Sequence, residues 1–137
     1  MGLFYADASA LVKLVLDEPE SPALRAFVTD ADLVSSEIVL TQVPRAIRRA
    51  VDLDPRLPLT ELIGRAGETL EAIALFALDR ALLFAAGALA EPALRALDAI
   101  HVAAAVDLSP LDAFVGYDER QAAAARLAGL RTVSPGA

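Results

Sequence analysis

The sequence contains no cysteine and no tryptophan, and it has only one histidine, one lysine and one methionine. The absence of cysteine excludes disulfide frameworks and zinc sites built on thiolates. Aromatic residues make up 5% of the chain, which leaves few rings for stacking on single-stranded bases. No apolar run has the length and purity of a membrane span, and the first residues lack the features of a signal peptide. We therefore expect a soluble, cytoplasmic protein that makes no membrane contact.

Hydrophobic residues account for 56% of the 137 residues, enough for one domain over 1–137 with a single core. Short apolar runs predict five strands, at 2–6, 32–36, 71–78, 112–117 and 130–134. Helical patterns fill the intervals, at 9–17, 22–31, 38–50, 59–70, 79–89, 91–108 and 118–129. This alternation favours parallel pairing through right-handed crossovers. The predicted fold is a three-layer α/β/α sandwich around a mainly parallel sheet of four to five strands.

Three aspartates occupy positions with a common geometry. Asp7 follows the first strand directly, Asp118 follows the strand "AFVGY", and Asp98 lies early in a strongly apolar helix. Each suits a helix N-cap or first turn, where a carboxylate complements the helix dipole. In a parallel α/β sheet, however, ligands gather beyond the carboxyl ends of the strands. If these ends coincide, the three acids lie close together.

Carboxylates that lie close together repel one another, and protonation or a bound cation relieves the repulsion. Oxygen ligands of this kind favour hard ions such as Mg²⁺ or Mn²⁺. An acidic metal cluster of this type commonly drives in-line displacement at a phosphodiester. The aspartates therefore indicate a candidate centre for phosphodiester hydrolysis.

Four blocks of the chain, taken in order, carry a resemblance: "YADASALVKL", "VSSEIVLTQVPRAIRRA", "LRALDAIHVAAA" and "VGYDERQAAAARLAGL". With these blocks the chain resembles the PIN-domain ribonuclease toxins of the VapC family, which belong to VapBC type II toxin–antitoxin systems. The resemblance implies a PIN-like fold, in agreement with the fold predicted above. It also implies a Mg²⁺- or Mn²⁺-dependent endoribonuclease that cuts structured RNA (tRNA or rRNA). The implied partners are a VapB antitoxin and a second copy of the chain in a homodimer.

The resemblance assigns Asp7, Asp98 and Asp118 as metal-binding catalytic acids and Ser9 as the hydroxyl residue that orients the site. Gln42 stands where the family usually carries a glutamate. Its carbonyl oxygen can still contact a metal, but it brings no charge. We therefore expect a catalytically weak or inactive chain. The alternative is a silent PIN module that binds antitoxin or RNA without cutting it.

Eleven of the twelve basic residues are arginine, a side chain suited to bidentate phosphate contacts. Although the net charge of −7 disfavours non-specific nucleic-acid binding, Arg45, Arg48 and Arg49 cluster within about one and a half helical turns. We expect these arginines and Lys13 to contact RNA or antitoxin, and the alternative is a solvated helix face.

Two further positions carry expectations. His101 follows Asp98 by three residues and so shares its helix face. A packing histidine with a hydrogen-bonded ring is favoured over a catalytic or metal-binding one. Gly116 stands where the VapC family often has threonine or serine, so this chain lacks a hydroxyl contact to the site. The substitution Gly116→Thr is therefore expected to raise metal affinity or activity modestly.

Overall fold

The computed structural model describes residues 2–137 and contains one five-stranded sheet. All strand pairs are parallel, in the order β3-β2-β1-β4-β5. The strands are β1 (Leu3–Ala6), β2 (Asp32–Ser36), β3 (Ala74–Phe76), β4 (Ala113–Val115) and β5 (Thr132–Val133). The predicted parallel sheet is confirmed.

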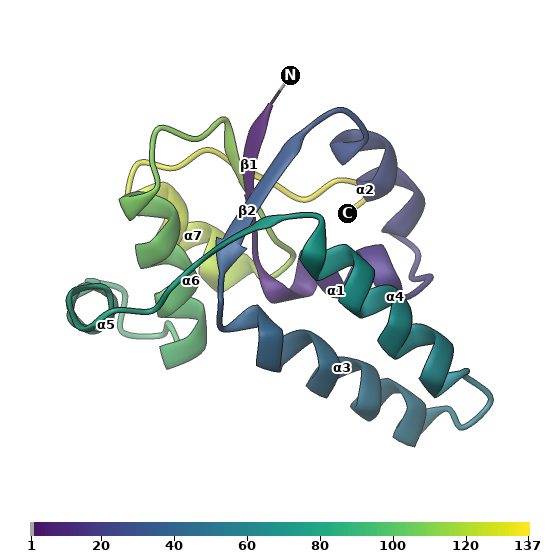
Figure 1. Ribbon diagram of the computed structural model, residues 1–137. Coiled ribbons are helices and arrows are strands. Elements are labelled where there is room, and N and C mark those ends of the chain that lie inside the picture. The colour runs from purple at the N-terminus through teal and green to yellow at the C-terminus, as the bar shows by residue number, and fades with distance from the viewer. Residues whose placement is uncertain (1) are drawn as a thin grey trace.

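Within residues 2–137, seven helices cover both faces of this sheet, and the three-layer arrangement is also confirmed. They are α1 (Ala8–Val15), α2 (Ser21–Val28), α3 (Val39–Leu53), α4 (Leu59–Glu71), α5 (Arg80–Gly87), α6 (Ala96–Asp107) and α7 (Glu119–Leu127). Figure 1 shows α5, α6 and α7 on one side of the strands and α1 to α4 on the other. None of the helices that the structure describes has both the length and the apolar character needed to cross a bilayer.

The alternation of side chains along the central strands builds two cores. Phe4 and Ala6 of β1 pack with α1 to α4, whereas Tyr5 packs with α6 and α7 on the opposite face. On β4 the same alternation places Phe114 beside Tyr5, with ring centroids 5.4 Å apart and nearly parallel planes. Because both faces are covered, these strands are apolar almost throughout.

The order of the strands creates a switch point beside β1. From β1 the chain moves outward to β2 and β3, and it then returns to place β4 on the other side of β1. Since crossovers are right-handed, the reversal also moves the connecting helices to the opposite face. The backbone N–H of Asp7 donates to the carbonyl of Val115 at 3.1 Å, one step beyond β1. Ligand sites in open α/β sheets lie at this kind of point.

Several predicted boundaries differ from the structure, most of all at the start of α6 and at the ends of β3. The segment 91–95 is a turn rather than helix, because the Glu91 carboxylate accepts the N–H of Ala93 at 3.0 Å. As a result α6 begins at Ala96 and Asp98 lies in its first turn. The strand predicted at 71–78 is limited to β3, since α4 continues through Glu71.

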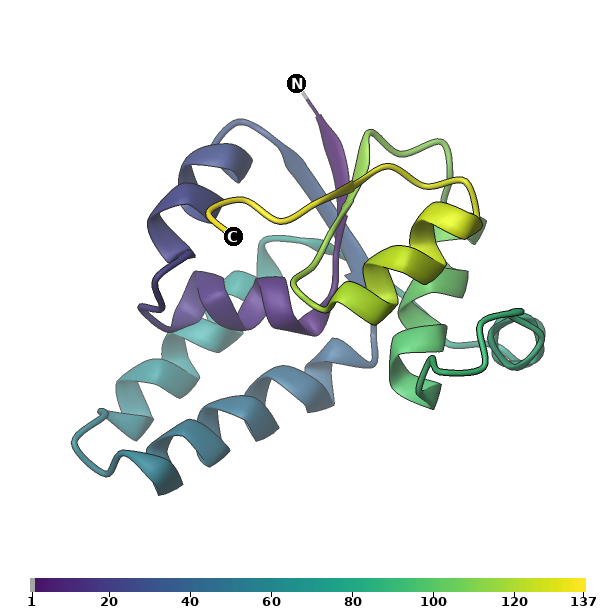
Figure 2. The same cartoon turned by 180° about the vertical axis from the view of Figure 1, so that it is seen from behind.

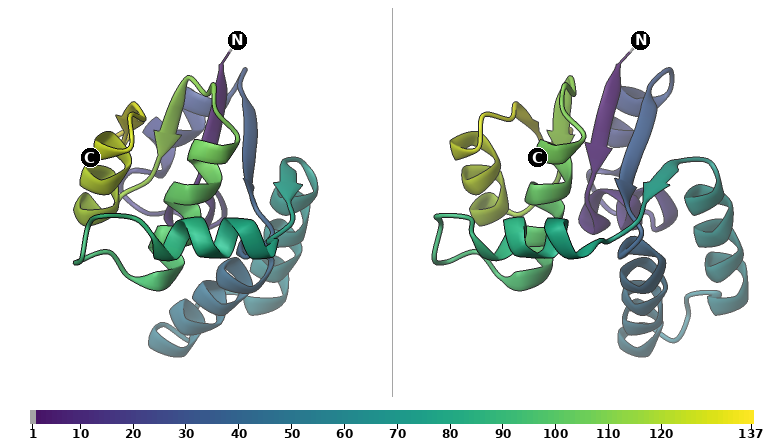
Figure 3. Two further views of the ribbon diagram at one scale, coloured as in Figure 1. Left: turned by 90° about the vertical axis from the view of Figure 1, so that its left-hand side faces the viewer. Right: turned by 60° about the vertical axis from the view of Figure 1, so that its left-hand side comes forward.

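Helices α3 and α4 lie side by side and extend beyond the edge of the sheet (Figure 3). The C-terminal segment crosses from α7 back toward α2 (Figure 2). It passes the loop between β4 and α7, where the Tyr117 hydroxyl donates to the Pro135 carbonyl at 2.7 Å. The Ser134 hydroxyl donates to the carbonyl of Gly116 in the same loop. These contacts anchor the loop that leads to Asp118.

Candidate active site

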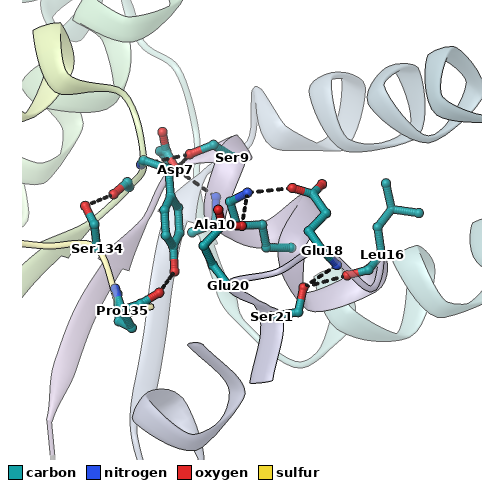
Figure 4. A network of polar contacts seen from close by, with 12 residues as sticks. Asp7, Ser9, Ala10, Leu16, Glu18, Glu20, Ser21, Ser134 and Pro135 are labelled. Atoms are coloured by element: carbon teal, nitrogen blue, oxygen red, sulfur yellow. Dashed lines mark hydrogen bonds and ion pairs between the residues drawn. The ribbon is translucent and has the colours of Figure 1, made fainter. Parts of the chain in front are cut away.

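Asp7 is the N-cap of α1 and is 4% exposed. Its Oδ1 accepts the backbone N–H of Ala10 at 3.0 Å and the hydroxyl of Ser9 at 2.6 Å. The Ser9 oxygen also accepts the backbone N–H of Tyr117 at 3.2 Å. Ser9 therefore ties the start of α1 to the loop after β4 and holds Asp7 in one orientation. Figure 4 shows these contacts around Asp7 and Ser9.

Asp118 is the N-cap of α7, and its Oδ1 accepts the backbone N–H of Gln121 at 2.9 Å. Asp98 occupies the first turn of α6. The three acids thus stand at the N-termini of three helices, whose dipoles favour negative charge. Among the hydrogen bonds of residues 2–137, none reaches Oδ2 of Asp7 or Asp118. In each of these two capping carboxylates, the cap occupies one oxygen and leaves the other without a hydrogen bond to the described chain.

The carboxylates influence one another electrostatically. Burial raises the pKa of Asp7 to about 6, although the bonds from Ser9 and Ala10 oppose the rise, and the charges of Asp98 and Asp118 add to it. Burial and the charge of Asp118 raise the pKa of Asp98, and Arg95 opposes this rise. Without a cation, Asp7 therefore takes up a proton at a higher pH than an ordinary aspartate does, near pH 6.

Within residues 2–137, no three histidine, cysteine or acidic side chains lie close enough together to enclose a metal ion. The donor chemistry nevertheless fits, because Mg²⁺ binds in proteins through one or two carboxylates and retains several waters. Asp7 and Asp118 each offer an uncommitted oxygen, and Asp98 adds to the negative charge that raises the pKa of Asp7. The Mg²⁺ or Mn²⁺ cofactor stays a prediction.

Gln42 lies on α3 and its side chain is half-buried. The distance between its Oε1 atom and Nε2 of His101 is 2.7 Å. The other ring nitrogen of His101, Nδ1, lies 2.7 Å from the hydroxyl of Tyr5. His101 is 1% exposed, and burial lowers its pKa to about 4. The expected packing histidine with a hydrogen-bonded ring is confirmed. Tyr5 was missed, although a tyrosine inside an apolar strand signals a buried hydroxyl that needs a partner.

A cleft of about 650 Å³ opens beside these side chains, between α1, α3 and the start of α7. Ser9, Gln42 and Asp118 line it, together with Arg45 and Arg49 of α3. These two arginines are four residues apart and so share one helix face. Arg48 is exposed and is not part of the cleft wall. The structure therefore separates the three predicted arginines into a cleft-facing pair and one that points elsewhere.

Lys13 also lines the cleft, but its charge is already compensated. Its ammonium group contacts Glu18 at 2.5 Å and Glu20 at 2.9 Å, and the side chain is 12% exposed. The same group lies 4.8 Å from the centre of the Tyr117 ring. Lys13 thus holds the chain after α1 against the loop that precedes Asp118, as Figure 4 shows for Glu18 and Glu20. A contact of Lys13 with RNA or antitoxin would have to compete with these ion pairs, and that contact stays a prediction.

Gly116 packs against the Asp7 carboxylate. A Cβ atom there would lie 3.2 Å from Cγ and Oδ2 of Asp7 and 3.1 Å from the Phe114 ring. A threonine would require one of these neighbours to shift by a few tenths of an ångström. The expectation that Gly116→Thr improves the site is therefore weakened by the structure, because any gain from the hydroxyl is opposed by crowding of Asp7.

A family model described as the PIN domain matches residues 4–129. The chain belongs to the PIN-domain family. Ribonuclease VapC46 of Mycobacterium tuberculosis is 37% identical to this PIN chain over 138 residues, which cover 98% of the chain and 99% of the relative. Ribonuclease VapC35 of the same species is 36% identical over 140 residues, and ribonuclease VapC47 is 32% identical over 147 residues. In both cases the match covers 98% of each protein. The resemblance to VapC ribonucleases is confirmed.

We predict that Asp7→Asn stabilises the metal-free protein at high pH. The pKa of about 6 in the fold exceeds the value of about 4 in an unfolded chain. The contribution of Asp7 to stability is therefore complete below pH about 4 and is lost as pH rises through about 6. Asparagine keeps the capping oxygen but carries no charge. Urea unfolding should show Asp7→Asn more stable by up to about 3 kcal/mol at pH 8, and little changed at pH 4.

Mn²⁺ should reverse this ranking at pH 8, because a ligand that binds only the folded state stabilises it. The expected result is a concentration-dependent rise in the stability of the unsubstituted chain and little rise in Asp7→Asn. Equal responses of the two proteins to Mn²⁺ would remove Asp7 from the metal site. An unsubstituted chain whose stability does not fall between pH 5 and pH 8 would contradict the electrostatic argument.

Proposed function

We propose that this PIN chain is a VapC-type toxin that hydrolyses phosphodiester bonds in structured RNA with Mg²⁺ or Mn²⁺. The observation that carries the proposal is the site at the switch point, where the buried Asp7 lies within electrostatic reach of Asp98 and Asp118. Arg45 and Arg49 stand in the wall of the same cleft as Asp118. Three relatives that match nearly the whole chain are named ribonucleases, which supports the same reaction here.

Each part of the site has a separate task in this reaction. Asp7, Asp98 and Asp118 would hold the ion, which when bound polarises the phosphate and activates a water molecule. Ser9 keeps Oδ1 of Asp7 engaged at 2.6 Å, so that Oδ2 stays available. Arg45 would bind phosphates beside the scissile one, together with Arg49, since the planar guanidinium matches phosphate geometry.

The cleft favours recognition of the RNA backbone over stacking on bases. Tyr117 is the one aromatic residue in its described wall. Its hydroxyl is bonded to Pro135 and its ring lies beside the Lys13 ammonium. Folded RNAs are recognised largely by shape and by phosphate and sugar contacts. This supports tRNA or rRNA as the substrate class.

We expect Gln42 to limit activity, because it leaves the cleft one negative charge short of a four-acid site. Gln42→Glu should raise Mn²⁺-dependent cleavage of total tRNA and rRNA by about tenfold or more, since an added carboxylate strengthens cation binding. Asp118→Asn in both backgrounds serves as the inactive control. Equal cleavage with glutamine and with glutamate would show that the three aspartates suffice.

The second candidate is a PIN module that binds RNA or antitoxin without cleavage, and the uncharged Gln42 is the observation that favours it. The same assay separates the two functions. If neither the unsubstituted chain nor Gln42→Glu cuts any RNA, while both retain it on a filter, the binding function takes precedence over the nuclease.

The protein partners are proposed on the same basis. Leu97 of α6 lines the cleft and is 46% exposed, and Leu40 of the neighbouring helix α3 is 48% exposed. An apolar helix of a VapB-type antitoxin could cover such residues and close the cleft. A homodimer is also proposed, and light scattering of the free chain and of a co-expressed complex tests both associations.

We predict that Arg45→Ala and Arg49→Ala weaken RNA binding, whereas Arg48→Ala does not. Removal of a cleft arginine that contacts a phosphate should lower the slope of log Kd against log salt concentration by about one. Filter binding of tRNA in EDTA, at several salt concentrations, measures this without cleavage. Arg48→Ala is the matched control, because it removes the same charge from the same helix. An equal loss in all three variants would show that only the overall charge of α3 matters.

A further inference from the structure

The hydrogen bonds of His101 have only one consistent direction. Oε1 of Gln42 is a carbonyl oxygen and can only accept, so Nε2 of His101 must carry the proton that is donated across the 2.7 Å contact. A neutral imidazole has one N–H, so Nδ1 must accept from the Tyr5 hydroxyl, also at 2.7 Å. The Tyr5 hydroxyl therefore donates to His101, and His101 in turn donates to Gln42.

This direction determines which group Gln42 presents to the cleft. Its carbonyl oxygen is turned to His101, which is buried between α6 and the sheet. Its amide nitrogen makes no hydrogen bond to any other residue among 2–137, and the Gln42 side chain forms part of the cleft wall. The polar group left for a ligand is therefore a donor, the amide NH₂, rather than an acceptor.

We propose that His101 is a positioning residue that turns the amide NH₂ of Gln42 toward the cleft, where it donates to an anionic oxygen of an RNA phosphate. Gln42 is then a phosphate-binding residue and not a metal ligand. The orientation of Gln42 follows from the core contacts alone, whereas its ligand rests on the proposed function.

Because glutamate and glutamine have nearly the same shape, a glutamate at position 42 could make the same contact with His101. One carboxylate oxygen could accept the proton of His101 Nε2, and the other would face the cleft as an acceptor suited to a cation. Replacing glutamate by glutamine thus exchanges an acceptor for a donor at one point of the cleft wall, while Tyr5 and His101 keep their roles.

Nitrogen NMR tests the orientation directly, because His101 is the only histidine. In protein labelled with ¹⁵N-histidine, the single imidazole should carry its proton on Nε2 and leave Nδ1 unprotonated between pH 5.5 and 8. The opposite tautomer would overturn the proposal. In that case Nε2 would accept from the amide of Gln42, and the carbonyl oxygen would face the cleft.

Substitution of Gln42 shows whether the two side chains are coupled. Gln42→Leu removes the acceptor, so the Nε2 proton should exchange faster with water and the imidazole signals should move. Thr41→Ala, one residue earlier in the same cleft wall, is the control and should leave these signals in place. Unchanged signals in Gln42→Leu would contradict the coupling.

Binding measurements separate the proposed ligand from a metal. Gln42→Leu should keep the Mn²⁺ affinity within about twofold and weaken tRNA binding in EDTA by about tenfold, the loss of one hydrogen bond to a charged group. A marked loss of Mn²⁺ affinity would show that Gln42 binds the metal. Unchanged tRNA binding would overturn the proposed contact between Gln42 and phosphate. The orientation of the Gln42 amide would still be decided by the NMR result.

Rescue by a conservative variant distinguishes positioning from packing. In His101→Gln, the new carbonyl can accept from Tyr5 and the new amide can donate to Gln42. This variant should retain tRNA binding, whereas His101→Leu should bind as weakly as Gln42→Leu. If His101→Leu does not fold, Gln42→Leu carries the comparison. Equal binding by the two His101 variants would reduce His101 to a packing residue.

Discussion

The burial of the Asp7 carboxylate at the carboxyl end of β1 is the constraint on which the site depends. Moving a charged group out of water costs free energy, and here the Ser9 hydroxyl, the Ala10 N–H and the N-terminus of α1 offset part of the cost. The remainder appears as a raised pKa, to which Asp98 and Asp118 contribute. A bound cation would relieve this repulsion, which is the physical basis of the proposed metal site.

The strand order explains how residues from distant parts of the chain come together at the site. Because β4 lies beside β1, residues more than a hundred positions apart meet at the switch point, and Ser9 bonds directly to Tyr117. The tight packing of Gly116 on Asp7 and the anchoring of the loop by the C-terminal segment follow from the same placement. Asp7 is therefore held in place by the loop after β4 as well as by α1.

The cleft wall contains both positively and negatively charged side chains. The chain carries a net charge of −7, yet Arg45 and Arg49 stand in the same cleft wall as Asp118. Lys13 reaches this cleft too, but Glu18 and Glu20 neutralise it. An anionic backbone entering the cleft would thus meet two guanidinium groups beside the Asp118 carboxylate, which is one of the proposed metal ligands.

Sequence alone was enough for the alternation of strands and helices, for the aspartates at helix starts and for the family. These features follow from short-range periodicity and from the chemistry of helix ends. The separation of Arg45 and Arg49 from Arg48 came from the structure. The start of α6 and the pairing of Lys13 depend on short-range contacts that the hydrophobic periodicity did not reveal. The direction in which Gln42 points was decided only by the tertiary structure. Gln42 and His101 are 59 residues apart, and local patterns carry no information about which distant donor a buried oxygen will find.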